Sequence, residues 1–317
     1  MSEAWDLGPG EPGLVSVIIP TYKRVLELVC AVQSALAQTH ERLEVIVVAD
    51  GPDPDARAAL EGLGANLRYM ELEVNSGPAA ARNLGVRVSR GEWLTFLDDD
   101  DTILPDKVAH CYAMADSARP KRMIATRVIY RRDGVEDVWP DRPIGADEDV
   151  ADYILKRPSL LGRPGVLPIQ ALMVHRSVLQ QVPFTSHKDH EDWAWLLDAW
   201  HLAGARVAFC WEPLVVYNIV TNSISRSRRM NWRDSMAWAK TYRKWMSAGA
   251  YNSFMSTKVA LKARRAGDWT GMRTITAAVL KNKPGWLDLM FLWGIALLPG
   301  PMLHSAWKKS LGHRKKR

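Results

Sequence analysis

The sequence predicts an α/β fold with a mainly parallel sheet and helices on both faces. Over the first hundred residues, short runs rich in Val, Ile and Leu alternate with segments of helical spacing. These runs are mostly apolar and do not alternate strictly with polar residues, which is typical of parallel strands buried on both faces. With 317 residues, of which 47% are hydrophobic and 24% charged, the chain can form one large domain or two smaller ones. This composition excludes general disorder.

The predicted elements follow in order along the chain. Strands are expected at residues 14–20, 43–49, 67–72 and 93–97. The helices between them are expected at 26–38, after residue 53 as far as 63, and at 79–88. Residues 131–152 are rich in acids, Pro and Gly and predict a long loop. Further elements are a strand at 170–174, a helix at 191–204 and one or two strands at 205–217. After Ser227 only helices are expected, at 231–247, 254–266, 268–281 and 286–298.

The net charge of +7 hides a strong asymmetry. Residues 1–225 hold 22 Lys and Arg against 32 Asp and Glu, whereas residues 226–317 hold 20 against 3. An acidic body followed by a basic tail suggests a polyanionic partner, either nucleic acid or a lipid surface. Nucleic acid is disfavoured because the body is acidic and no nucleic-acid-binding motif occurs.

The cysteines and the N-terminus point to a reducing compartment. Cys30, Cys111 and Cys210 are far apart and form no CxxC pair, so neither a zinc site nor a disulfide framework is indicated. Residues 1–13 hold three acids, no base and no apolar run, so no secretory signal is expected. We therefore expect a cytoplasmic protein.

Four consecutive aspartates, Asp98 to Asp101, directly follow the fourth predicted strand. Ligands of parallel sheets bind beyond the carboxyl ends of the strands, and the first two strands also end in polar residues there. Adjacent carboxylates repel one another unless a cation neutralises them, and hard oxygen ligands suit Mg²⁺ or Mn²⁺ on a diphosphate. The alternative is a solvated acidic turn that caps the next helix. Neither GxGxxG nor GxxxxGK[ST] occurs, which disfavours dinucleotide and P-loop chemistry.

Five segments in order carry a family resemblance. They are VSVIIPTYKR at 15–24, ADG at 49–51, NSG at 75–77 with ARNLG at 81–85, GEWLTFLDDDD at 91–101, and Glu191-Asp192 at a predicted helix start. Together these segments make the chain similar to the family 2 glycosyltransferases, whose fold is of the GT-A type. The resemblance covers about residues 14–225.

The resemblance implies a role for each matching residue. Pro20, Thr21 and Tyr22 would pack on the nucleobase, and Asp50 would accept a hydrogen bond from it. Arg82 belongs to the same nucleotide-sugar-binding set. These assignments describe a site for a nucleoside-diphosphate sugar.

The resemblance also implies the metal and catalytic residues. Asp98 would face the ribose and the metal, Asp100 would ligate Mn²⁺ or Mg²⁺, and Asp99 and Asp101 would support them. Asp192 would act as general base, and Glu191 would have an orienting role beside it. Position 49 is Ala where the family has Asp, and position 220 is Val where it often has His, so the sequence shows no third protein ligand to the metal.

The resemblance divides the chain at residue 227. Residues 1–227 would form the catalytic domain, with a nucleotide-sugar half at about 14–105 and an acceptor half at about 106–227. Residues 228–317 would form a basic helical extension. Oligomeric state cannot be predicted from this sequence.

The extension predicts attachment to a membrane. Its apolar segment at 286–298 is shorter than the roughly 20 residues that a spanning helix needs. Trp286, Trp293 and Trp307 bracket this segment, and six Lys and Arg follow between 308 and 317. Such a segment can lie on an anionic bilayer without crossing it. The alternative is a packed helical subdomain with a basic solvent face.

The resulting prediction is an inverting, metal-dependent glycosyltransferase, peripheral on the inner face of the plasma membrane. It would transfer sugar from a nucleoside-diphosphate sugar, most simply a UDP-sugar, to a glycan or lipid-linked acceptor in bacterial cell-surface polysaccharide synthesis. The alternatives are a sugar nucleotidyltransferase and a non-catalytic, membrane-tethered protein that binds sugar nucleotides.

Overall fold

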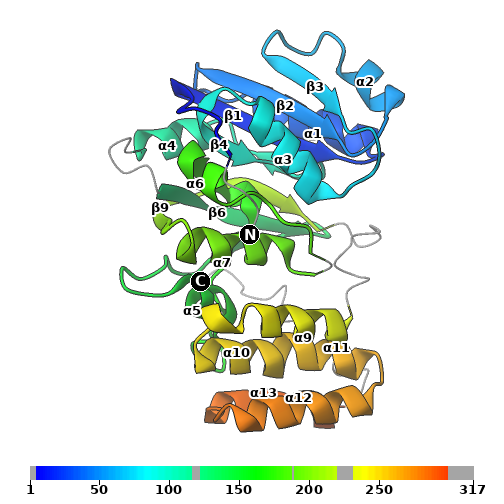
Figure 1. Cartoon of the computed structure of the whole chain (residues 1–317), viewed down its shortest axis with the longest axis vertical. Coiled ribbons are helices and arrows are strands. Elements are labelled where there is room, and N and C mark those ends of the chain that lie inside the picture. Colours follow the sequence, from blue (N-terminus) through cyan, green and yellow to red (C-terminus); the bar gives the residue numbers. More distant parts are fainter. Residues whose placement is uncertain (1–4, 116–121, 188, 220–230, 299–317) are drawn as a thin grey trace. The chain divides into compact units, whose positions relative to one another are not determined.

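The computed structural model describes residues 5–115, 122–187, 189–219 and 231–298 (Figure 1). The chain divides into two compact units. Unit 1 comprises residues 1–133, 167–187 and 191–219, and unit 2 comprises residues 134–166, 188–190 and 220–317. The predicted boundary after residue 227 differs from this division, because residues 134–166 group with the C-terminal helices. One reason is packing within unit 2, where helix α5 (Val150–Leu155) lies against helix α10 (Ala248–Phe254).

Unit 1 is built on a mixed sheet with the strand order β3-β2-β1-β4-β8-β6-β9-β5. The strands β3, β2, β1 and β4 pair in parallel with their neighbours in this order, and β6 also pairs in parallel with β9. Strand β8 is antiparallel to both β4 and β6, and β5 is antiparallel to β9. The α/β prediction is confirmed, and the predicted parallel pairing holds among β1 to β4, whereas β8 and β5 make the sheet as a whole mixed. The strands are β1 (Glu11–Thr21), β2 (Leu43–Ala49), β3 (Leu67–Glu71), β4 (Gly91–Phe96), β5 (Thr102–Ile103), β6 (Arg122–Arg132), β8 (Leu172–His175) and β9 (Arg206–Asn218).

Helices cover both faces of this sheet (Figure 1). Val45 and Val47 of β2 face the core that holds α1 and α2, whereas Ile46 and Val48 face α3. Because successive strand residues point to opposite faces, a strand covered on both sides is apolar on both faces, as β2 is from Val45 to Ala49. The helices of unit 1 are α1 (Val25–Leu36), α2 (Pro54–Leu60), α3 (Pro78–Val88), α4 (Lys107–Ala113), α6 (Arg176–Gln181) and α7 (Glu191–His201).

Close packing of α3 on the sheet depends on Gly85. A Cβ atom at this position would lie 2.4 Å from Cγ2 of Ile18 on β1, well inside van der Waals contact. Glycine therefore lets the helix backbone approach the strand. This contact fixes α3, and with it Arg82, beside the carboxyl ends of β1 and β4.

Three regions differ from the sequence prediction, and one is the helix expected at 254–266, which begins at residue 248. The predicted loop at 131–152 contains the end of β6, strand β7 (Val135–Trp139) and the start of α5. The single long helix predicted at 231–247 is instead α9 (Trp232–Thr241) followed by a 3₁₀ turn (Arg243–Trp245). Residues 205–217 form one strand, β9, whose pairing with β6 shifts register after Cys210.

Unit 2 is mainly helical. Helix α10 continues through a π-helical turn (Met255–Val259) into α11 (Ala260–Arg265), and α12 (Trp269–Lys281) and α13 (Trp286–Leu297) follow. Its core includes a buried ionic group, in which Oδ2 of Asp189 lies 2.9 Å from Nζ of Lys262 and accepts a hydrogen bond from Ser235. Within the described residues, no helix is long and apolar enough to cross a membrane. The predicted basic tail after 298, with Trp307, lies outside the described residues.

Candidate active site

The aspartate run lies at the carboxyl end of β4, beside the ends of β1 and β2. Two of its members are buried and hold the loop in place. Oδ2 of Asp99 accepts a hydrogen bond from Oγ1 of Thr21 (2.8 Å), at the end of β1. Asp101 accepts one from Nε2 of Gln170 (2.7 Å) and one from the backbone N–H of Asn218 (2.9 Å). The loop is therefore fixed from three distant parts of unit 1.

Burial and mutual repulsion raise the pKa values of aspartates in this loop. Burial raises the pKa of Asp99 to about 6, although Thr21 and Arg24 act in the opposite direction. Burial, with the charges of Asp98 and Asp100, raises the pKa of Asp101 well above its usual value. The pKa of Asp100 is also raised, first by burial and then by Asp98. Burial is the largest cause of each rise, and a cation bound at the loop would oppose it by favouring the ionised carboxylates.

Asp98 and Asp100 are the aspartates that could hold a divalent cation. Their side chains are both 28% exposed, whereas Asp99 and Asp101 are buried. Each has one oxygen bound by an arginine, since Nη2 of Arg82 is 2.8 Å from Oδ1 of Asp98 and Nη1 of Arg24 is 2.7 Å from Oδ2 of Asp100. The second oxygen of each remains for a hard cation, and carboxylates are the ligands that Mg²⁺ and Mn²⁺ prefer. The donor set fits such an ion.

Arg82 joins the aspartate loop to the start of helix α7. Its guanidinium is buried, and Nη1 lies 3.1 Å from Oδ1 of Asp192 and 3.3 Å from Oε1 of Glu191, while Nη2 binds Asp98. These negative charges raise the pKa of Arg82 against the opposing effect of burial. The Arg82 guanidinium is thus shared by three carboxylates, which come from two segments almost a hundred residues apart.

Asp192 is better placed than Glu191 to meet a substrate. The Asp192 side chain is 37% exposed, against 11% for Glu191. Burial and the charge of Asp98 raise the pKa of Asp192, whereas the charge of Arg82 lowers it. Burial is the largest of these effects, so the pKa is raised overall. A carboxylate whose pKa is raised is a stronger base, and Arg82 and the helix N-terminus keep it ionised.

The residues predicted to hold the nucleobase lie at the ends of β1 and β2. Pro20 and Thr21 are buried and Tyr22 is 52% exposed. The Asp50 carboxylate accepts backbone hydrogen bonds from Ser76 (2.6 Å) and Gly77 (2.9 and 3.0 Å), ahead of helix α3. Asp50 therefore fixes the loop that leads into α3, and its contact with a base stays a prediction.

Three polar residues of the site were not singled out by the sequence analysis. Arg24 binds both Asp99 and Asp100, and Gln170 and Asn218 hold Asp101. Arg24 lies in the first segment of the family resemblance, so that motif contained a signal for it. Gln170 and Asn218 follow no local pattern, because the sheet alone brings them to the loop.

The profile of glycosyl transferase family 2 matches residues 16–182, just over half of the chain. The chain belongs to glycosyl transferase family 2. The matched region contains Arg82 and the four aspartates, and it ends before Glu191 and Asp192.

Two similar proteins are named for polysaccharide synthesis. The amylovoran biosynthesis glycosyltransferase AmsB of Erwinia amylovora is 24% identical over 266 residues, which cover 80% of this chain and 85% of that protein. The succinoglycan biosynthesis protein ExoO of Rhizobium meliloti is 34% identical over 122 residues, covering 38% and 35%. An uncharacterized glycosyltransferase of Rickettsia bellii is 41% identical over 95 residues, and this match spans only 14% of its length.

Solved structures share the fold of this family 2 chain. Mannosyltransferase PcManGT of Pyrobaculum calidifontis, in complex with GDP-Man and Mn²⁺, has a TM-score of 0.58 at 17% identity and covers 98% of this chain and 88% of its own. S. aureus TarS 1–349, in complex with UDP-GlcNAc, has a TM-score of 0.54 at 17% identity and covers 94% and 88%. The predicted GT-A fold is thereby confirmed.

Proposed function

We propose that this family 2 protein is an inverting glycosyltransferase that uses a nucleoside-diphosphate sugar and Mn²⁺ or Mg²⁺. The observation that carries the proposal is the Arg82 cluster, in which one buried guanidinium binds Asp98 of the aspartate loop and Asp192 of helix α7. A donor bound at the loop and an acceptor activated by Asp192 would then meet at a single place.

The proposed reaction is one displacement at the anomeric carbon. A carboxylate oxygen of Asp192 takes the proton of the acceptor hydroxyl as its oxygen bonds to that carbon. The bond from the anomeric carbon to the diphosphate breaks, and its electron pair leaves with the diphosphate oxygen. A cation held by Asp98 and Asp100 would supply Lewis-acid stabilisation of that leaving group. A single displacement inverts the configuration.

Arg82 and Glu191 support this step without touching the reacting atoms. Arg82 holds Asp192 ionised and fixes its distance from Asp98. Glu191, which is nearly buried, binds the same guanidinium nitrogen as Asp192, Nη1 of Arg82. Pro20, Thr21, Tyr22 and Asp50 are proposed to bind the base, with uracil the first to test, since TarS was solved with UDP-GlcNAc.

The donor class can be tested by thermal denaturation with a panel of nucleoside diphosphates and sugar nucleotides in the presence of Mn²⁺. We expect one base to raise Tm by several degrees, because a ligand at a hundred times its Kd stabilises by about 2.7 kcal/mol. EDTA should remove the shift and stop transfer, and Mn²⁺ or Mg²⁺ should restore both. Activity indifferent to chelator would contradict the metal assignment. Consumption of nucleoside triphosphate would favour a nucleotidyltransferase, and binding without turnover would favour a non-catalytic protein.

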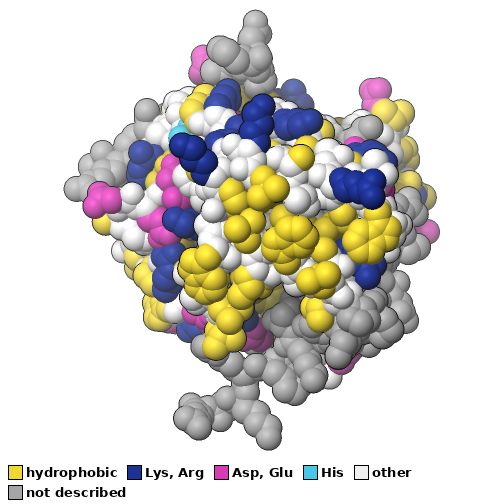
Figure 2. Space-filling view, turned by 90° about the horizontal axis from the view of Figure 1, so that it is seen from below, with side chains coloured by type: hydrophobic (Ala, Val, Ile, Leu, Met, Phe, Trp, Pro, Cys, Tyr) yellow, Lys and Arg dark blue, Asp and Glu magenta, His cyan; other side chains and the backbone are white. Residues whose placement is uncertain are grey.

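We also propose that unit 2 attaches the enzyme to an anionic membrane surface, where a lipid-linked acceptor would lie. Helix α13 is apolar around most of its circumference, yet Leu292 is its single fully buried residue. Figure 2 shows hydrophobic side chains gathered on the face of unit 2 that it views, with Lys and Arg around them. The exposed large apolar residues of α12 and α13 are Trp269, Leu280, Trp286, Trp293 and Leu297.

Charge favours a membrane over a second copy of the chain as the occupant of this face. Arg265, Arg273, Lys281 and Lys283 are exposed on or beside α11 and α12, and like charges would oppose self-association. Each basic residue near an anionic leaflet contributes about 1 kcal/mol. Attachment by exposed indoles and basic residues requires no spanning helix.

Vesicle sedimentation tests this attachment. The protein should pellet with phosphatidylglycerol-containing vesicles and far less with phosphatidylcholine alone, and replacing Trp286 and Trp293 together with Ala should reduce pelleting at least tenfold. Trp211→Ala, at an exposed tryptophan of unit 1, is the matched control and should change nothing. Equal pelleting of the double variant, or a dimer that this variant dissociates, would refute the proposal.

A further inference from the structure

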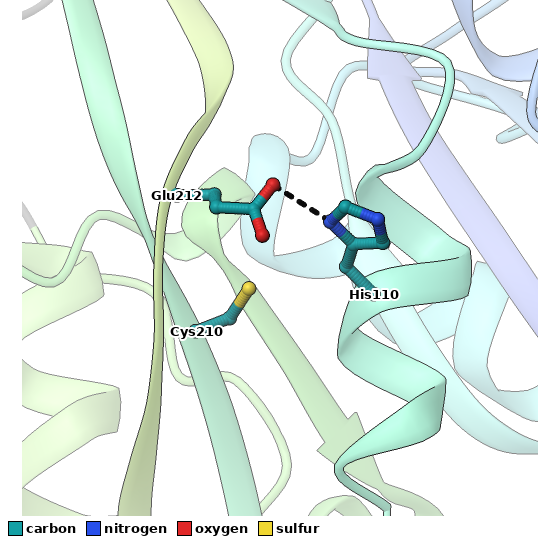
Figure 3. A group of neighbouring side chains, drawn as sticks. All are labelled: His110, Cys210 and Glu212. Atoms are coloured by element: carbon teal, nitrogen blue, oxygen red, sulfur yellow. Dashed lines mark ion pairs between the residues drawn. The ribbon is translucent and has the colours of Figure 1, made fainter.

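A second cluster of potential metal ligands lies in unit 1, away from the aspartate loop. His110 stands in the last turn of helix α4, and Cys210 and Glu212 lie on strand β9. One ligand atom from each residue lies within 4.8 Å of the others. In Figure 3 the imidazole of His110 faces the Glu212 carboxylate, and the Cys210 sulfur lies close to both.

The local fold explains why these residues meet. Thr126 of β6 pairs with Cys210, but the next residue, Arg127, pairs with Pro213, so Trp211 and Glu212 form a bulge in β9. A bulge redirects the side chains of its strand. Helix α4 packs against both β6 and β9, which brings His110 over this bulge.

The side chains of His110 and Glu212 lie close together but do not form a hydrogen bond. Nδ1 of His110 is 2.8 Å from Oε2 of Glu212, yet Nδ1 is buried and has no hydrogen-bond partner. Two atoms that carry lone pairs repel at this distance unless a proton or a cation lies between them. A buried polar atom without a partner is costly, and coordination to a metal would satisfy it.

We propose that His110, Cys210 and Glu212 bind a zinc ion. Imidazole nitrogen, thiolate sulfur and carboxylate oxygen are the ligands of Zn²⁺, and a thiolate disfavours Mg²⁺ and Mn²⁺. Bond lengths of about 2.0–2.3 Å place tetrahedral ligands about 3.3–3.7 Å apart, so small side-chain rotations suffice. Cys210 would bind as the thiolate and release its proton to solvent. Glu212, 57% exposed, leaves access for the ion and for a water as fourth ligand.

This ion would be structural and separate from the proposed catalytic cation. Cys210 precedes Asn218, which binds the aspartate loop, by eight residues of β9. Allowing for the bulge and about 3.3 Å per residue, the two sites are about 20 Å apart. The zinc would tie α4 to β9. This proposal does not depend on the proposed transferase activity.

The test measures metal content. The full chain, made without a polyhistidine tag, is stripped with chelator, dialysed against Zn²⁺ and analysed for zinc per chain. We expect the wild type to hold one zinc more than His110→Ala or Cys210→Ala, and Co²⁺ to give a thiolate charge-transfer band that both variants lose. Cys30→Ser, at an exposed cysteine, is the matched control and should behave as wild type.

Two results would overturn the proposal. Equal zinc content in the wild type, His110→Ala and Cys210→Ala would show that these residues hold no ion. Loss of the zinc in Asp100→Asn, with its retention in His110→Ala, would place the ion at the aspartate loop. His110 is about two-fifths exposed, so its replacement tests the site even if Cys210→Ala fails to fold.

Discussion

Replacing Asp192 with Asn is expected to lower kcat for sugar transfer by roughly 10²–10⁴-fold, because general-base catalysis contributes about that much. The amide keeps the shape of the side chain and can still accept a hydrogen bond from Arg82, but it cannot take a proton. Donor binding should therefore remain close to that of the wild type. Steady-state transfer and donor Kd, measured on the same preparation, check both parts.

Asp198→Asn supplies the control, since Asp198 lies on the same helix nearly two turns further on. This variant should retain wild-type kcat. An Asp192→Asn protein that keeps a tenth of the wild-type rate would refute the assignment of Asp192 as base. A similar loss in both variants would instead indicate that helix α7 tolerates no change of charge.

Much of the sheet could be predicted because its signal is local. β1, β2 and β4 are largely apolar runs, and burial on both faces requires such runs whatever the rest of the chain does. The same strands fixed the site, since Asp98 to Asp101 had to lie at the carboxyl edge of the sheet once β4 was recognised. The start of α7 was also predicted, which placed Glu191 and Asp192 at a helix N-terminus.

Long-range pairing could not be predicted in this way. The contacts of Asp101 with Gln170 and Asn218 span 69 and 117 positions. They depend on an antiparallel strand, β8, inserted between β4 and β6, which no local pattern specifies. Likewise, the cysteine spacing indicated no metal site, because His110 meets Cys210 and Glu212 only through the packing of α4 on a bulged strand.

Which aspartates are exposed was also beyond the sequence. Four identical residues in a row carry no internal distinction, and the predicted roles of Asp98 and Asp100 came from the family resemblance. In the structure the members alternate, with Asp99 and Asp101 buried in hydrogen bonds and Asp98 and Asp100 partly exposed. The proposed division between supporting and ligating aspartates rests on this alternation.

Replacing Arg82 with Met is expected to reduce both stability and activity strongly. Asp98, Glu191 and Asp192 would lose the cation that they share, and removal of one partner from a buried ionic group costs about 3–5 kcal/mol. Because Asp98 and Asp192 are partly exposed, solvent screening should reduce this to about 2–3 kcal/mol. Thermal denaturation should show a Tm lower by several degrees, and kcat should fall at least a hundredfold because Asp192 is no longer held ionised and in place.

The stability lost in Arg82→Met should depend on pH in a defined direction. Without the guanidinium, Asp192 loses the charge that lowers its pKa while burial and Asp98 still raise it, so its pKa in the folded state rises further above that in the unfolded state. A carboxyl group with a raised folded-state pKa destabilises the fold above that pKa and ceases to do so once protonated. The Tm difference from wild type should therefore be larger at pH 8 than at pH 5. A difference independent of pH would mean that Arg82 acts by packing alone.

A second substitution separates charge from catalysis. Adding Asp98→Asn to Arg82→Met removes one of the repelling carboxylates, so the double variant should recover part of the lost stability, and the two changes should not be additive. It should recover none of the activity, since Asp98 is a proposed metal ligand and Asp192 still lacks its partner. Recovery of transfer in the double variant would refute the view that Arg82 serves the reaction by holding Asp98 and Asp192 together.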